Sequence, residues 1–399
     1  ANMDVNSVAN HNVSMVEPHT SIVDAAAQMR AEHVGDLIVV AHRGGRRVPI
    51  GIITDRDIVT GIVAKGVSPN DVTVADVHAF DANGTASYFL GVNRNKRGMT
   101  MDLTQAPQRE ALLALLQDAD VLVENFKTGS MEKWGLGFDT LSAKFPRLIH
   151  CRVSGFGADG PKGGLPGYDA AVQAMVGMIS INGESDANGG TPVRLGVPAV
   201  DLATGLNAAL GILMALHERT KSGKGQFVEA ALYDCGLSFL HPHTANHLLD
   251  PSRVPGRSGN AHPNICPYDT FATRTVPIFL AVGNDGQFAK LAEQIGAPEL
   301  ASDARFADNA LRSANRVELK RLLEARLTTF DCEPRADRLI RAGVPCAPTR
   351  DIPAALADPH TAHRGMVVQI GEYKGVASPI KLSRTPATYR LAPPLRDKP

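Results

Sequence analysis

The chain has 399 residues, of which 44% are hydrophobic and 21% charged. This balance is typical of a folded globular protein and excludes a disordered chain. Lysine plus arginine equals aspartate plus glutamate, 41 each, so no overall charge attracts the chain to nucleic acid or to an anionic membrane. A local cluster of cations must therefore hold any anionic ligand. The length predicts two or three compact units.

The cysteines indicate the compartment. Five are scattered along the chain without metal-ligand spacing, and their odd number argues against a disulfide framework. We interpret them as reduced thiols in a cytoplasmic protein. No charged-then-apolar leader opens the chain, and no uninterrupted apolar run reaches the length of a membrane span. We therefore expect no membrane partner.

Residues 1–77 form the first predicted unit. An alanine-rich helix begins after Ser21, and two apolar strands at 37–40 and 49–53 follow it, joined by a turn of two glycines. A short polar joint at 78–83 ends the unit. This order of elements predicts a small sheet packed against helices.

The closing motif of this unit is GIITDRD, from Gly51 to Asp57. The motif and the element order resemble one CBS repeat, a βαββα unit that works in pairs, and no second repeat follows. The resemblance implies that Thr54 and Asp57 contact the phosphate and ribose of an adenine nucleotide. The alternative interpretation is that both residues only cap the next helix.

Strands and helices alternate after the joint. We expect a strand at 99–103, an amphipathic helix at 106–117, a strand at 121–123 and another at 148–153. This alternation predicts an α/β fold with a Rossmann-like parallel sheet, in which ligands lie beyond the carboxyl ends of the strands.

The segment GGLPGYD delivers Tyr168 and Asp169 to the start of an apolar, alanine-rich helix. Backbone N–H groups and the helix macrodipole favour a carboxylate there, and the glycines let a substrate approach the main chain. The alternative interpretation is that Asp169 only caps its own helix. A flexible polar loop at 183–192 leads to a long apolar helix at 201–219.

Residues 226–333 are expected to form a smaller α+β domain, and residues 334–399 to return to the large domain. The strands of the smaller domain are predicted at 226–232, 268–271 and 277–282. Three histidines are close together near its start: His241, His243 and His247. Because no acidic or thiol ligand accompanies them, we expect no metal site.

The order of three sequence blocks resembles that in the family III CoA-transferases. The blocks are SGFGADGP at 154–161, the Asp169 segment and DLATG at 201–205. This superfamily includes formyl-CoA transferase, carnitine CoA-transferase and methylacyl-CoA racemase. The resemblance runs from about residue 84 to the C-terminus, which makes residues 84–225 the first part of the large domain. It implies transfer of coenzyme A between carboxylic acids through an aspartyl-CoA thioester on Asp169, with no metal and no tightly bound cofactor.

The resemblance also implies a site for the CoA nucleotide at successive strand ends. Its residues are Lys96, Arg97, Asn125, Phe126 and Lys133. The ring of Phe126 would stack on the adenine, and the cations would meet the anionic groups. Each cation taken alone is also consistent with a solvated surface charge.

The substrates are indicated by one further stretch. The sequence GNAHPNICPYDTF at 259–271 resembles the branch of the family that passes CoA from succinyl-CoA to another dicarboxylic acid. Arg194 or Arg257 would pair with the distal carboxylate of such a substrate. Relatives form interlocked homodimers, and the polar links expected at 183–198 and 333–350 would permit one here.

Two alternative functions stay open. A racemase of the superfamily carries a histidine where this chain has Tyr168, and a phenol with a pKa of about 10 is a poor base at neutral pH. The other alternative is a non-catalytic protein that binds a nucleotide or CoA. It arises because the strand, helix and glutamine that open the family's large domain do not precede Gly84, which predicts impaired turnover.

Overall fold

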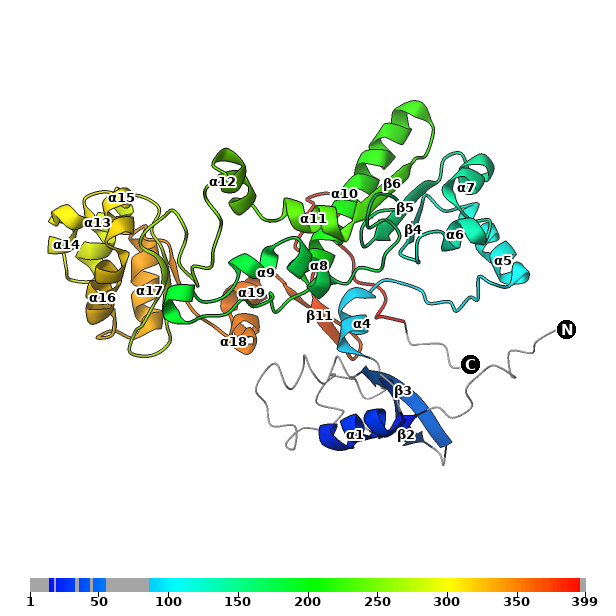
Figure 1. The fold of residues 1–399 in the computed structure, drawn as a ribbon, viewed down its shortest axis with the longest axis horizontal. Helices are drawn as coiled ribbons and strands as arrows, with labels where there is room; N and C mark the ends of the chain where they lie inside the picture. The colour runs from blue at the N-terminus through cyan, green and yellow to red at the C-terminus, as the bar shows by residue number, and fades with distance from the viewer. Residues whose placement is uncertain (1–13, 18, 33–35, 44–45, 55–85, 395–399) are drawn as a thin grey trace. The chain divides into compact units, whose positions relative to one another are not determined.

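The structure is a computed structural model that describes residues 14–17, 19–32, 36–43, 46–54 and 86–394. Two compact units make up the chain (Figure 1). Unit 1 combines residues 1–100 with residues 351–399, and unit 2 consists of residues 101–350. Asp169 and the helices around it belong to unit 2.

Unit 1 begins with a βαββ arrangement. Its elements are β1 (Met15–Val16), α1 (Ile22–Glu32), β2 (Asp36–Arg43) and β3 (Arg46–Thr54). β2 pairs with β1 in parallel and with β3 in antiparallel register, from Asp36 opposite Thr54 to Arg43 opposite Arg46. The helix and hairpin predicted from the sequence are confirmed. Thr54 is the last residue of β3, whereas Asp57 and the helix expected after it lie outside the described residues.

The rest of unit 1 joins the segment around residue 95 to the C-terminal tail. Its elements are α4 (Ser87–Val92), α18 (Ile352–Ala357), α19 (Pro359–His363) and the hairpin β10 (Val367–Ile370) to β11 (Tyr373–Val376). Asn95 has a positive φ of 61°, and its side chain is hydrogen-bonded to the C-terminal tail. Its side chain donates to the carbonyl of Thr388 and accepts the N–H groups of Arg390 and Leu391.

The parallel sheet of unit 2 has the order β4 (Val121–Glu124), β5 (Ile149–Ser154), β6 (Phe227–Ala231). Around it lie α5 (Ala106–Leu116), α6 (Ser130–Lys133) and α7 (Phe138–Lys144). The strand expected at 99–103 was wrong. The side chain of Asp102 accepts hydrogen bonds from the N–H and hydroxyl of Thr104, and this turn leads directly into α5.

The helices that build the site surround a second core. They are α8 (Asp169–Met175), α9 (Met178–Ile181), α10 (Ala199–Ser222) and α11 (Leu232–Ser238), and α12 (His243–Leu249) follows. Val172 of α8, Val200 of α10 and Leu232 of α11 are buried in one cluster. α10 also packs against β5 and β6, and the residue after its end is Gly223, whose positive φ of 75° suits a residue without a Cβ.

α10 is long and apolar enough to cross a membrane by length and composition alone, with 33% of its most apolar window buried. Core helices of soluble proteins pass the same test. The helix covers a parallel sheet, as crossover helices do.

The smaller sheet of unit 2 is antiparallel, in the order β7 (Tyr268–Phe271), β8 (Ile278–Ala281), β9 (Cys346–Pro348). Its helical cover comprises α13 (Asp285–Gln294), α14 (Glu299–Ser302), η5 (Ala304–Phe306), α15 (Asn309–Ala314), α16 (Arg316–Leu327) and α17 (Cys332–Arg341). α17 buries Ala336 and Leu339 in the same core as β8. The polar link expected at 333–350 is therefore wrong, because this stretch forms a packed helix and a strand. Residue 333, expected as the end of the smaller domain, lies inside α17.

Candidate active site

Asp169 lies just beyond the carboxyl end of β5, and two glycines place it there. Gly155 directly follows β5, and a Cβ built on it would come within 2.6 Å of the backbone nitrogen of Gly167. Only glycines permit such a crossing of two backbones. From the sequence we expected glycines before Asp169 to let a substrate approach the main chain. In the structure, Gly155 and Gly167 instead allow the segment before Asp169 to pack against the residue that follows β5.

The carboxylate of Asp169 caps a helix other than its own. Asp169 is the first residue of α8, and its Oδ2 accepts the backbone N–H of Val200 at 2.8 Å and of Asp201 at 3.1 Å. Both donors belong to the first turn of α10, whose own N-cap residue, Pro198, makes no side-chain cap. Asp169 therefore does cap a helix, as the alternative interpretation predicted. The capped helix is not its own, however, because it begins thirty residues later, at residue 199.

The other oxygen of the carboxylate meets a residue that sequence reasoning missed. The side-chain amide of Gln173 donates to Oδ1 of Asp169 at 2.5 Å. The two residues are four apart on α8, the spacing at which helical side chains meet, and that spacing was the available signal. Three neutral donors therefore hold the carboxylate from both sides.

Asp201 adds a second carboxyl group beside Asp169. Partial burial, and then the negative charge of Asp169, raise the pKa of the Asp201 carboxyl above its ordinary value. The backbone N–H of Asp201 stabilises the negative charge on Asp169. Ionisation of the Asp201 side chain would place a second negative charge beside it, which is unfavourable. The N-terminal end of α10 thus tolerates one negative charge better than two.

The residues expected to hold the CoA nucleotide are divided between the units. Asn125 and Phe126 are exposed in the loop after β4, and Lys133 is the exposed last residue of α6. The ring of Phe126 meets Trp134 edge to face, with 5.2 Å between the centroids. Lys96 and Arg97 belong to unit 1 and are exposed.

A buried ion network lies under the loop that carries Phe126. Arg152 of β5 donates from Nε to Glu124 at 2.5 Å and from Nη2 to Glu132 of α6 at 2.6 Å. The second oxygen of Glu124 accepts the N–H of Phe126 at 2.9 Å. Burial raises the pKa of Glu124, but His150 and Arg152 outweigh it and bring the pKa below its ordinary value. The network therefore fixes both the Phe126 loop and α6.

The arginines expected to meet a substrate carboxylate have other partners. Arg257, whose side chain is 10% exposed, pairs with Asp186 and donates to the carbonyl of Glu184. These contacts join Arg257 to the 183–192 loop, which the sequence predicted to be flexible. Arg194 is exposed and donates to the carbonyl of Leu195.

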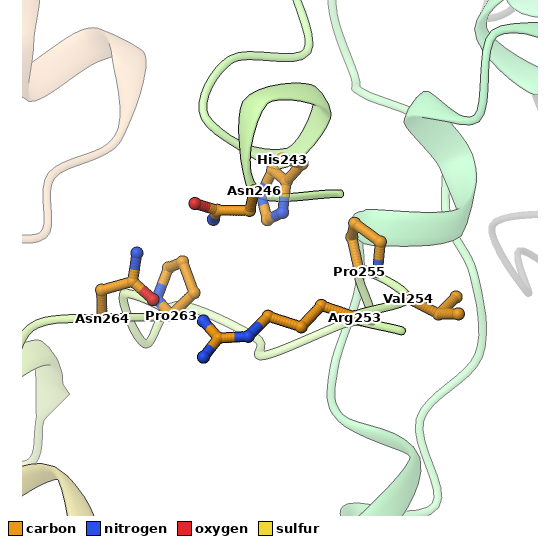
Figure 2. Close-up of a pocket in the computed structure, with 8 residues that line it drawn as sticks. His243, Asn246, Arg253, Val254, Pro255, Pro263 and Asn264 are labelled. Atoms are coloured by element: carbon orange, nitrogen blue, oxygen red, sulfur yellow. The ribbon is translucent and has the colours of Figure 1, made fainter. Parts of the chain in front are cut away.

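A separate pocket of about 200 Å³ lies between α12 and the loop that follows it (Figure 2). Its lining comprises His243, Asn246, Arg253, Val254, Pro255, Gly256, Pro263 and Asn264. It contains none of the predicted site residues. Over the described ranges, the structure has no group of three or more His, Cys, Asp and Glu side chains placed to hold a metal ion.

Comparison with known proteins identifies the family. Residues 70–398 match the model of CoA-transferase family III, and residues 5–64 match that of the CBS domain. The chain is 37% identical to a succinate–glutarate CoA-transferase of Agrobacterium fabrum, over 78% of each chain. It is 35% identical to a succinyl-CoA:mesaconate CoA-transferase of Haloarcula hispanica, over 80% of this chain and 81% of the relative.

A solved structure agrees with both the sequence match and the expected fold. The crystal structure of a CAIB/BAIF family protein from Brucella suis superposes with a TM-score of 0.70 at 38% identity, covering 79% of this chain and 83% of that one. The α/β architecture with a parallel sheet is thereby confirmed. The chain belongs to CoA-transferase family III, an enzyme family that transfers coenzyme A, and carries a CBS domain ahead of the region that matches this family.

Proposed function

We propose that this enzyme transfers coenzyme A between dicarboxylic acids, with a succinyl-CoA-type thioester as donor and Asp169 as the covalent nucleophile. The observation that carries the proposal is the carboxylate of Asp169, held through both oxygens by Gln173 and the first turn of α10 beyond the end of the sheet. The names of the relatives support the substrate class, because they pair succinate or succinyl-CoA with glutarate or mesaconate.

The proposed reaction begins when an oxygen of Asp169 attacks the thioester carbonyl. The C–S bond breaks, CoA leaves as the thiolate, and a mixed anhydride forms. The thiolate then attacks the Asp169 carbonyl carbon, which releases the donor acid as its carboxylate and leaves an aspartyl-CoA thioester. The acceptor carboxylate repeats these steps in reverse and regenerates Asp169. Each step exchanges acyl compounds of similar energy, so the protein must chiefly position the groups and exclude water.

For the CoA nucleotide we propose the expected residues that belong to unit 2, with Phe126 as the stacking ring. Its 43% exposed side chain and its edge contact with Trp134 leave a ring face open to a base. Lys133 and Asn125 would meet the anionic and polar groups. For the CBS domain, an adenine nucleotide at Thr54 and Asp57 remains our proposal.

The structure favours transfer over racemisation. A racemase needs a base at the α carbon, and the residue beside Asp169 is Tyr168. A phenol has an ordinary pKa of about 10 and is therefore a poor base at neutral pH. The hydrogen bonds to Asp169 suit a carboxylate that is held in one orientation for attack. This is the role that a nucleophile requires.

We further propose that the enzyme is a homodimer. On α10, Leu202, Leu206, Leu210 and Leu213 are between 51% and 72% exposed and follow one another at helical spacing. Such a stripe is costly to leave in water, and a second copy would cover it. Light scattering over a dilution series should show a dimer at every concentration, and folded monomer at low concentration would contradict this proposal.

Hydroxylamine trapping tests the nucleophile. Purified enzyme that turns over succinyl-CoA with a panel of dicarboxylic acids should form a hydroxamate, which mass spectrometry of the digested chain would locate at Asp169. The matched control is Asp169→Asn, which keeps an oxygen acceptor for the N–H groups of α10. An adduct at another carboxylate would show that Asp169 is not the nucleophile.

A further inference from the structure

Gln173 is the most deeply buried polar side chain next to the proposed nucleophile. It is 0% exposed, and both ends of its amide are hydrogen-bonded. The nitrogen donates to Oδ1 of Asp169 at 2.5 Å, and the oxygen accepts the backbone N–H of Leu195 at 3.0 Å. A buried amide that satisfies both ends in this way has a fixed orientation.

The identity of the two partners decides which end of the amide faces Asp169. Leu195 offers a backbone N–H, which can only donate, so the atom that faces it must be the amide oxygen. The NH₂ group therefore points to Asp169. Leu195 itself lies in the segment that leads into α10 and packs against the core shared by α8 and α10.

We propose that Gln173 is a positioning residue that holds Oδ1 of Asp169 in line for attack on the thioester. This inference rests on the proposed role of Asp169. The N–H groups of Val200 and Asp201 fix the other oxygen, so the motion left to the carboxylate is rotation of its plane. The hydrogen bond from the amide of Gln173 restricts this rotation. The orientation is then established before the substrate binds, as efficient nucleophilic attack requires.

A simpler alternative is that Gln173 only ties α8 to the segment around Leu195. The two hydrogen bonds of the amide allow a test that separates these roles. In Gln173→Glu, an oxygen still accepts the N–H of Leu195, but an ionised carboxylate replaces the donor to Asp169. In Gln173→Met, a side chain of similar length makes neither bond.

The chain offers a matched control for the structural role. The amide of Asn182 donates to the carbonyl of Val193 at 2.9 Å, so it also fastens the segment before α10, without touching Asp169. Asn182→Leu removes that link alone. We expect its kcat to stay within about twofold of the wild type, because the carboxylate keeps all three donors.

The experiment measures kcat and KM against pH with succinyl-CoA, together with the rate of hydroxamate formation at Asp169. Gln173→Met should lower kcat and the trapping rate by about 10²-fold, with KM for succinyl-CoA within about threefold of the wild type. Gln173→Glu should lose activity as pH rises, because the second carboxylate then ionises and repels the first. It should regain activity as pH falls, because the protonated Glu then donates a hydrogen bond to the carboxylate of Asp169 in place of the amide.

The outcomes are distinct. A wild-type pH profile in Gln173→Glu, or a wild-type kcat in Gln173→Met, would overturn the positioning role. So would equal losses of kcat and of CoA binding in both variants and in Asn182→Leu, since that pattern marks a structural tie. If wild-type enzyme forms no hydroxamate at Asp169, the proposed function fails instead.

Discussion

Unit 2 holds two carboxylates near the carboxyl ends of its parallel strands, and they are stabilised in opposite ways. Glu124 is 5% exposed and faces the guanidinium of Arg152, so its charge is neutralised by another charge. Asp169 is half-buried, and its bonds come from a neutral amide and two backbone N–H groups. A cation would hold the lone pairs of a carboxylate more tightly than neutral donors do. The difference indicates a structural role for Glu124 and agrees with the nucleophilic role proposed for Asp169.

The largest expected effect separates the two carboxylates by activity. Asp169→Asn should lower transfer by at least about 10³-fold, because an amide cannot form the anhydride. CoA binding, measured by calorimetry, should be unchanged. The unfolding free energy should fall by about 1–3 kcal/mol, because the Asn oxygen still caps α10 but its NH₂ group then faces the NH₂ group of Gln173 without an acceptor. Asp169→Ala loses the cap as well, so its loss should be at least as large. Activity in the Asn variant above a tenth of the wild-type value would break the comparison.

The second effect is on stability and concerns the other carboxylate. Arg152→Met leaves Glu124 buried without its cation, and we expect a loss of about 3 kcal/mol in the free energy of unfolding, measured with urea. The matched control is Arg305→Met, which removes an exposed ion pair with Asp303, and its loss should be much smaller because solvent screens such a pair. Equal losses of unfolding free energy in the two variants would mean that burial of the Arg152 network does not increase its contribution to stability.

The pH dependence of Arg152→Met follows from the direction of the pKa shift. In the wild type the pKa of Glu124 lies below its ordinary value of 4.5, so its stabilising contribution is present above that pH and is lost as pH falls through the lowered pKa. In the variant the lowering by Arg152 is lost, while burial still raises the pKa and His150 and the N–H of Phe126 still lower it, so the pKa of Glu124 is higher than in the wild type. The difference in unfolding free energy between wild type and variant should therefore shrink in acid, and a constant difference would contradict the assignment.

A third effect concerns substrate binding through the loop that Glu124 anchors. Phe126→Ala should raise KM for succinyl-CoA by about tenfold, because stacking of a base on an aromatic ring contributes roughly 1–3 kcal/mol. The value of kcat at saturating substrate should stay unchanged, since the adenine that the ring would stack on is not the reacting end of the CoA thioester. Steady-state kinetics with succinyl-CoA measures both, and an unchanged KM would remove Phe126 from the nucleotide site.

The smallest expected effect is a change in melting temperature on replacing Asp201, the carboxyl group beside Asp169. The pKa of Asp201 is raised by partial burial and by Asp169, so ionisation of Asp201 destabilises the fold as pH rises through and above the ordinary pKa. Asp201→Asn should therefore raise the melting temperature slightly at neutral pH and leave it unchanged in acid. A lower melting temperature at neutral pH would show that the Asp201 side chain stabilises α10.

The sequence predicted the elements whose apolar pattern is strong. The strand predicted at 268–271 agrees with β7 at both ends, and the long helix starting near 201 was found two residues longer at its N-terminal end and three at its C-terminal end. α17 was missed because its many charged residues resemble a polar link, while the buried side chains of Ala336 and Leu339 mark only one face. A narrow apolar face of this kind becomes visible only when the residues are placed at the helical period of 3.6.

The candidate site was predictable in part. A glycine-rich approach to an apolar helix is a local pattern, so Asp169 could be placed at a helix start. Its contacts with Val200 and Asp201 could not be predicted, because they join segments about thirty residues apart through backbone N–H groups, which every residue except proline carries. The pairing of Glu124 with Arg152 depends on strand register, which a single sequence does not fix.

Oxygen exchange tests the central claim most directly. When the acceptor carboxylate leaves an anhydride with Asp169 as its thioester, one acceptor oxygen stays on the enzyme. Enzyme that turns over a dicarboxylic acid labelled with oxygen-18 should therefore carry heavy oxygen in the peptide that contains Asp169 and in no other peptide, as read by mass spectrometry. Transfer that proceeds with an unlabelled Asp169 would contradict the account.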